Sequence, residues 1–114
     1  MLKRINRISS RKEFETIKLK GVLCRGELVS GLVLQTEDKD KRFGIIVSKK
    51  ISRRAVDRNK IRRLVYLAIS ENLEKLSEGI RIIFLVRPEI VGKKYEEVSI
   101  EVFNLVQKIP IKRL

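Results

Sequence analysis

The segment 42–69 contains a strand pattern, a basic turn and a helix pattern in direct succession. Apolar side chains recur at every second position from Phe43 to Val47, which is the period of a strand with one buried face. Further on, apolar side chains recur at the i, i+3, i+4, i+7 and i+8 spacing of an amphipathic helix. This apolar stripe consists of Ile61, Leu64, Val65, Ala68 and Ile69. The segment therefore predicts a half-buried strand followed by a half-buried helix.

The turn and the outer side of this helix are rich in cationic and polar side chains. At about 100° per residue, the side opposite the stripe carries Asn59, Arg62, Arg63 and Tyr66. The turn before the helix carries Lys49, Lys50, Arg53 and Arg54. The helix N-terminus adds free N–H groups that attract anions, and an arginine can bridge two phosphate oxygens. The pattern predicts a surface that grips a sugar-phosphate backbone.

Two simpler interpretations of these charges stay open. Arg62 and Arg63 could belong to a merely solvated helix face, because many charge runs represent nothing more. Arg58 lies near the border of the apolar stripe, where it could form an ion pair or extend its charged end to solvent.

The register of these motifs is similar to that of a known family. R-F-G-x-x-V-S-K-K begins at Arg42, and A-V-x-R-N-K-x-R-R-L begins at Ala55. Together they resemble the signature of the protein subunit of bacterial ribonuclease P, with Lys60 where that family usually carries a second arginine. The stretches 6–8 and 10–14, followed by Gly21, are similar to the region of the family's first helix. The resemblance thus covers most of the chain.

The resemblance implies a non-catalytic polypeptide within an endoribonuclease holoenzyme. It would bind the catalytic RNA and the 5′ leader of precursor tRNA, and the RNA would remove the leader with the help of Mg²⁺. No cofactor of the polypeptide, no membrane partner and no small-molecule substrate are expected. The residues expected by position to contact RNA are Ser48, Lys49, Lys50, Arg53, Arg54, Arg58, Asn59, Lys60, Arg62, Arg63 and Tyr66.

The resemblance also implies a cleft for the single-stranded leader beside the first helix. The residues expected there are Arg11, Phe14, Lys18 and Phe43. A base stacked on Phe14 would contribute about 1 to 3 kcal/mol, although Phe14 as an ordinary core residue is an equally open interpretation. The chain departs from the family at Lys18, where a second aromatic residue is common.

The composition agrees with an RNA partner but is less specific. With 27 Lys and Arg against 14 Asp and Glu, the net charge of +13 predicts a polyanionic partner. A ribosomal or other structured-RNA-binding protein without a role in tRNA processing is the alternative, since ribosomal RNA selects the same charge and size. A membrane-surface helix is disfavoured because neighbouring strands can cover its apolar stripe. We find no signal-peptide pattern, so cytoplasmic residence is the default expectation.

The titratable residues offer little for catalysis by the polypeptide itself. The chain has no histidine and one cysteine, Cys24, which excludes a histidine acid/base pair and an internal disulfide. Glu37, Asp38 and Asp40 could seed the metal site of a stand-alone nuclease, but a turn flanked by lysines favours a solvated role. For Asp57, compensation of charge at the helix N-terminus is the favoured interpretation.

The remaining patterns predict one domain over 1–114, with a flexible basic arm at 1–7. The sequence from Ser10 to Glu13 has the pattern of a capping box, and Gly21 is a candidate C-cap. A strand over 28–35 is expected to form a hairpin with the Phe43 strand through the turn after it. The run 80–86 reads as a continuous apolar strand covered on both faces and stopped by Pro88.

A last amphipathic helix is predicted from Val98 to Ile109, ending before Pro110. The order is helix, strand, strand, helix, strand, helix, with room for one extra short strand. This is an α+β two-layer sandwich. Its β-α-β crossover would be right-handed in ~98% of cases by the general rule, whereas the resemblance implies the rare left-handed form.

Overall fold

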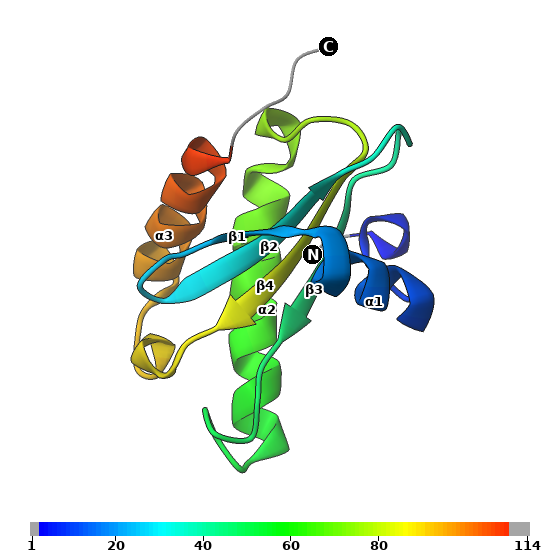
Figure 1. The fold of residues 1–114 in the computed structure, drawn as a ribbon. Helices are drawn as coiled ribbons and strands as arrows, with labels where there is room; N and C mark the ends of the chain where they lie inside the picture. The colour runs from blue at the N-terminus through cyan, green and yellow to red at the C-terminus, as the bar shows by residue number, and fades with distance from the viewer. Residues whose placement is uncertain (1–2, 110–114) are drawn as a thin grey trace.

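Three main helices and one four-stranded sheet make up residues 3–109, which the computed structural model describes (Figure 1). The elements in chain order are α1 (Arg11–Lys20), β1 (Val22–Cys24), β2 (Val29–Gln35), β3 (Arg42–Ile46), α2 (Ala55–Glu71), β4 (Ile80–Val86) and α3 (Tyr95–Lys108). Short 3₁₀ helices lie at Arg4–Asn6, Leu73–Lys75 and Pro88–Ile90. The predicted α+β class is confirmed, and β1 is the extra short strand.

The strand order of the sheet is β1-β2-β4-β3. β4 lies between β2 and β3, antiparallel to β2 and parallel to β3, so the predicted hairpin between the 28–35 strand and the Phe43 strand is wrong. The hairpin in this region is β1-β2, in which Val22 lies opposite Val33. The most apolar strand, β4, takes an inner place, where five of its seven residues are buried.

β3, α2 and β4 form the predicted β-α-β unit. In Figure 1 both strands run downward, α2 passes behind the sheet, and β4 lies to the left of β3. The crossover is therefore left-handed, as the resemblance implied and against the general rule. It brings the basic turn and the start of α2 to the lower end of the sheet.

Helices lie on both faces of the sheet. α2 and α3 cover one face with a large core in which Phe43, Phe84 and Val65 are fully buried. α1 lies across the other face, over a smaller core of Ile8, Ile17 and Ile83. Four further strand side chains of that face are only half-buried: Leu32, Leu34, Ile46 and Leu85. Because α1 has just ten residues, an apolar strip of the sheet stays partly open to solvent.

The two longer helices follow the predicted stripes. In α2 the buried residues are Ile61, Val65, Ala68 and Ile69, and Leu64 is half-buried. In α3 they are Val98, Val102, Leu105 and Val106. α3 begins three residues before the predicted start at Val98 and ends at Lys108, one residue before the predicted end at Ile109. Pro110 lies outside the described residues. No helix within residues 3–109 is long and apolar enough to cross a membrane.

The segment before α1 lies along the edge of the sheet. Residues 1 and 2 of the predicted arm are outside the described part, while Arg4–Asn6 form a 3₁₀ turn. The Asn6 side-chain amide donates to the Lys41 carbonyl at 2.8 Å, and the Ile8 N–H donates to the Phe43 carbonyl at 2.9 Å. Through these bonds the N-terminal segment pairs with the outer edge of β3.

The predicted capping pattern of α1 is confirmed at its C-terminus, where Gly21 is the C-cap and donates its N–H to the Ile17 carbonyl at 2.7 Å, and only in part at its N-terminus. Ser10 caps the helix by accepting a bond from the Glu13 N–H at 3.3 Å, but the carboxylate of Glu13 bonds Arg42 and Arg81 instead of returning to Ser10. Only half of the capping box therefore forms. Gly21 follows the helix with an extended φ of −70°, so glycine is suited here by close packing against the last turn rather than by a left-handed conformation.

Candidate nucleic-acid interface

A compact hydrogen-bonded turn joins β3 to α2. The Ile51 N–H donates to the Ser48 carbonyl at 3.0 Å. The Ser52 hydroxyl donates to the Asp57 carboxylate at 3.0 Å, which anchors the turn to the first turn of α2. Arg58 is half-buried and donates to the Ser52 carbonyl at 2.8 Å. Arg58, a predicted RNA-contact residue, thus stabilises the turn itself. Asp57 lies in the first turn of the helix, as predicted.

Six other predicted contact residues form what we call the cationic face. It consists of Lys49, Lys50, Arg53, Lys60, Arg62 and Arg63. Five are exposed and Arg62 is half-exposed. Within residues 3–109, none of the six has a carboxylate oxygen within 4.0 Å. Since unpaired cations repel one another, this face is suited to a polyanion that neutralises them.

One hydrogen bond orders the centre of the cationic face. The Arg62 guanidinium donates to the side-chain oxygen of Asn59 at 2.8 Å, across one turn of α2. The bond turns both side chains along the helix and leaves the amide N–H₂ of Asn59 free to donate. An oriented guanidinium suits a phosphate, and a free amide suits a ribose 2′-hydroxyl or a base edge.

The ring of Tyr66 is in contact with an arginine of the N-terminal segment. The guanidinium carbon of Arg7 lies 5.1 Å from the centre of the Tyr66 ring, a cation–π contact between the N-terminal segment and α2. Burial raises the pKa of the Tyr66 phenol, and the charges of Arg7 and Arg62 partly oppose that rise. No sequence pattern assigns Arg7 to the interface, because the contact joins residues 59 positions apart and leaves no local pattern.

The predicted leader-cleft residues do not share one environment. Phe43 is fully buried under α2 and α3, so its assignment to the cleft is wrong: in β3, the side chains of Phe43 and Gly44 point to opposite faces. Phe14 is half-buried, and a Cβ atom on Gly44 would lie 2.6 Å from the tip of its ring. Arg11 and Lys18 are exposed on α1. Phe14 therefore packs on the sheet while part of it stays accessible.

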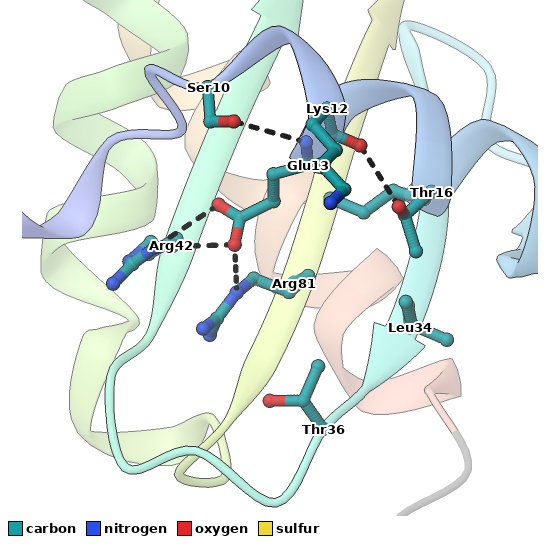
Figure 2. A pocket seen from close by; sticks show the side chains of 9 residues that line it. Ser10, Lys12, Glu13, Thr16, Leu34, Thr36, Arg42 and Arg81 are labelled. Atoms are coloured by element: carbon teal, nitrogen blue, oxygen red, sulfur yellow. Dashed lines mark hydrogen bonds and ion pairs between the residues drawn. The ribbon is translucent and has the colours of Figure 1, made fainter.

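A buried charged network that the sequence analysis missed ties α1 to the sheet (Figure 2). Arg81 is 3% exposed, donates to Glu13 at 3.2 Å and to Asp38 at 2.9 Å, and also bonds the Asp40 carbonyl. Arg42 pairs with Glu13 and Asp40 at 3.2 Å each. A single arginine inside the otherwise apolar run 80–86 was the available signal, because a buried charge requires a partner.

This network corrects the interpretation of the acidic turn. Asp38 and Asp40 are bonded to arginines of two strands instead of being merely solvated. A cavity of about 350 Å³ adjoins the network and is lined by Ser10, Lys12, Glu13, Thr16, Ile17, Leu34, Thr36, Arg42 and Arg81. Its lining includes none of the four predicted leader-cleft residues. Among residues 3–109, no group of three or more His, Cys, Asp or Glu residues is placed to hold a metal ion.

Asp38 should make stability depend on acid pH. Its carboxylate accepts the N–H groups of Asp40 and Lys39, which lower the pKa of Asp38, and Arg81 adds to this effect. A lowered pKa means that the ionised form stabilises the fold above the unfolded pKa, and that this contribution disappears as pH falls through the folded pKa. We expect Asp38→Asn to be less stable than wild type near pH 7, with a difference that shrinks below pH 3.8, the ordinary value.

The measurement is urea unfolding of both proteins between pH 7 and pH 2. Glu37→Gln is the matched control, because the Glu37 carboxylate is exposed on the same turn. A difference between wild type and Asp38→Asn that stays constant over the whole pH range would contradict the expectation.

Taken together, the fold and the cationic face define a class: a small basic α+β protein with one surface suited to a polyanion. Comparison with known proteins narrows the class. The family model described as Ribonuclease P matches residues 2–110. A ribonuclease P protein component of Microcystis aeruginosa is 32% identical over 114 residues, covering 96% of this chain and 95% of that protein. Another, of a Pseudanabaena species, is 30% identical and covers 97% of each chain. The chain belongs to the ribonuclease P protein family.

Solved structures agree at the level of the fold. The RNase P protein from Thermotoga maritima matches with a TM-score of 0.82 at 24% identity, covering 91% of this chain and 97% of that one. The RNase P protein of Staphylococcus aureus matches with a TM-score of 0.80 at 23% identity, covering 90% and 93%. The family resemblance predicted from the sequence is confirmed by the family model and the relatives.

Proposed function

We propose that this chain binds the catalytic RNA of ribonuclease P and the 5′ leader of precursor tRNA. In this role it assists the RNA in the endonucleolytic cut that produces the mature 5′ end of the tRNA. The observation that carries the proposal is a cationic face that has no carboxylate partner within residues 3–109, in a member of this family. The reaction would take place in the cytoplasm.

The hydrolysis itself is assigned to the RNA, with Mg²⁺ serving the RNA. The polypeptide has no histidine for acid/base catalysis. Of the three acids considered for a metal site, Asp38 is paired with Arg81 and Asp40 with Arg42, which leaves only Glu37. An arginine beside a carboxylate favours charge pairing over cation binding, because the guanidinium repels an incoming metal ion.

The cationic face would act mainly through phosphates. Each lysine or arginine that neutralises a phosphate releases condensed counterions, so affinity falls steeply with salt. Arg62 enters this contact already oriented by Asn59, which lowers the entropy lost on binding. The face thus supplies affinity and orientation, while base contacts carry any sequence preference.

The leader would lie on the face of the sheet that α1 only partly covers. Leu32, Ile46 and Leu85 offer half-buried apolar surface there, and the accessible part of Phe14 adds an aromatic edge. Apolar and aromatic side chains accept bases of any sequence, which suits a leader of varied sequence. Lys18, which is exposed on α1, would attract the leader phosphates.

The test is multiple-turnover cleavage of a 5′-extended precursor tRNA by the catalytic RNA at low Mg²⁺. Wild-type protein should stimulate cleavage only when the RNA is present. Asn59→Ala combined with Arg62→Ala should weaken binding of the catalytic RNA about tenfold or more, because it removes charge-assisted contacts. The salt slope of log K should also fall by about 1.

A control pair removes the same two kinds of group, an amide and a cation, from a different helix. Asn104→Ala with Lys108→Ala removes an exposed amide and an exposed cation from α3 and should leave stimulation unchanged. Absence of stimulation by wild type would refute the proposal in favour of another RNA-binding role. Cleavage by the protein alone would refute the assignment of hydrolysis to the RNA.

A further inference from the structure

Arg7 is an arginine whose hydrogen-bonding capacity the protein leaves unused. It makes no ion pair within residues 3–109, and its Nε is buried without a hydrogen-bond partner there. Its guanidinium lies over the ring of Tyr66, 5.1 Å from the ring centre. A guanidinium has five N–H donors, and buried donors usually have partners. Stacking on Tyr66 therefore holds the Arg7 side chain in place, while its Nε–H has no hydrogen-bond partner within residues 3–109.

The backbone on each side of Arg7 fixes where this side chain points. Arg7 itself is extended, with φ −112° and ψ 136°, and pairs with Phe43 as an isolated bridge. The next residue, Ile8, is 8% exposed and belongs to the small core beneath α1. Because neighbouring side chains in an extended segment point to opposite sides, burying Ile8 under α1 directs Arg7 toward α2.

The surroundings of Arg7 are cationic. Its guanidinium is stacked on the ring of Tyr66, and Arg62 lies four positions before Tyr66 on α2, so both arginines lie on the side of the helix that carries this ring. Arg62 is bonded to Asn59 and not to a carboxylate. Two like charges held near each other are stabilised by an anion that both can bond, and a phosphodiester offers two free oxygens for the purpose.

We propose that Arg7, stacked on Tyr66, is a phosphate-binding residue that extends the RNA interface from α2 onto the N-terminal segment. The ligand is a backbone phosphodiester of the catalytic RNA, bonded by Arg7 and Arg62, with the Tyr66 hydroxyl available as a third donor. The inference rests on the proposed function. It adds a contact outside the β3–α2 segment and gives the ordered 3₁₀ turn at Arg4–Asn6 a role, because that turn leads directly into Arg7.

The competing explanation is that Arg7 only fastens the N-terminal segment to α2. Three variants separate the two roles. Arg7→Gln removes the charge, Arg7→Lys keeps the charge but loses the planar fork, and Arg25→Gln is the control, since Arg25 is exposed on the loop after β1. The measurements are affinity for the isolated catalytic RNA at several salt concentrations and the thermal midpoint of each free protein.

Arg7→Gln is expected to bind the RNA about tenfold more weakly, and its salt slope should be smaller by roughly 0.7 to 0.9, the share of one phosphate contact. Arg7→Lys should keep the wild-type slope and bind several-fold more weakly, because a point charge cannot bridge two oxygens. Arg25→Gln should match wild type in both.

Two results would overturn the inference. One is an Arg7→Gln variant with wild-type affinity and slope. The other is weaker binding with an unchanged slope and a lower thermal midpoint, which would make Arg7 a purely structural fastening. If wild type itself fails to bind the catalytic RNA, the proposed function fails as a whole, and that outcome is distinct from a failure at Arg7 alone.

Discussion

Replacing Gly79 by alanine should lower the free energy of unfolding by roughly 3 kcal/mol or more, the sum of backbone strain and overlap. Gly79 has φ +81°, a left-handed conformation that disfavours any side chain. A Cβ atom there would also overlap the carbonyl oxygens of Thr36 and Asp38. The overlap cannot be relieved cheaply, because the Gly79 carbonyl accepts the Thr36 N–H at 2.9 Å and the Thr36 hydroxyl at 2.7 Å.

Gly92 provides a closely matched control for this prediction. Its φ is also +81°, but a Cβ atom there would meet no atom within 4 Å. Gly92→Ala should therefore show the strain alone, about 1 kcal/mol. Urea unfolding of both variants measures the difference directly. Equal losses for the two would mean that contact between the turn at Gly79 and the turn after β2 contributes little.

Glu13→Ala should cost about 3 kcal/mol, because it removes one of the partners of a buried arginine. Arg81 is 3% exposed and Glu13 is 21% exposed, so solvent does little to replace the lost bond. Glu15→Ala on the same helix is the control. Its ion pair with Arg11 is 3.6 Å long between side chains 70% and 95% exposed, and such pairs contribute at most about 0.5 kcal/mol.

A double variant tests the explanation for Glu13. If the loss arises from an unpaired buried charge, Glu13→Leu with Arg81→Met should recover much of it, because the buried charge is then absent. Asp38, which loses Arg81 in this variant, is 45% exposed and can be solvated. Failure to recover would indicate that packing of α1, and not the charge, is the source. Under the proposed function, Glu13→Ala should also bind the leader more weakly, since Glu13 joins the helix that carries Phe14 to β3 and β4.

Local patterns were sufficient for the long elements. The stripe of α2, the bounds of the 80–86 strand and the course of α3 agree with the structure, because each is a periodicity within one segment. The place of the basic turn at the start of α2 also followed from neighbouring residues. The motif register was enough to identify the family, which the family model then confirmed over residues 2–110.

Pairings between distant segments were beyond these patterns. A turn between two strand patterns suggested a hairpin, but β4 separates β2 from β3, because a strand 34 positions after Ile46 competes better for the inner place. The burial of Phe43 in the core under α2 and α3 followed from that strand order. The Glu13 carboxylate bonds Arg42 and Arg81 instead of Ser10 for the same reason, because the two arginines come near it only after folding.

The candidate interface likewise contains residues that local patterns predict and residues that only the tertiary structure places. Residue types and helix spacing were enough to place Asn59, Arg62 and Arg63 on one exposed side of α2, since they depend on 3.6 residues per turn alone. The tertiary structure alone could turn Arg58 back onto its own turn and bring Arg7 over Tyr66. Contacts of this kind depend on which backbone groups are already bonded and on which surfaces are already covered, and neither is encoded within a single segment.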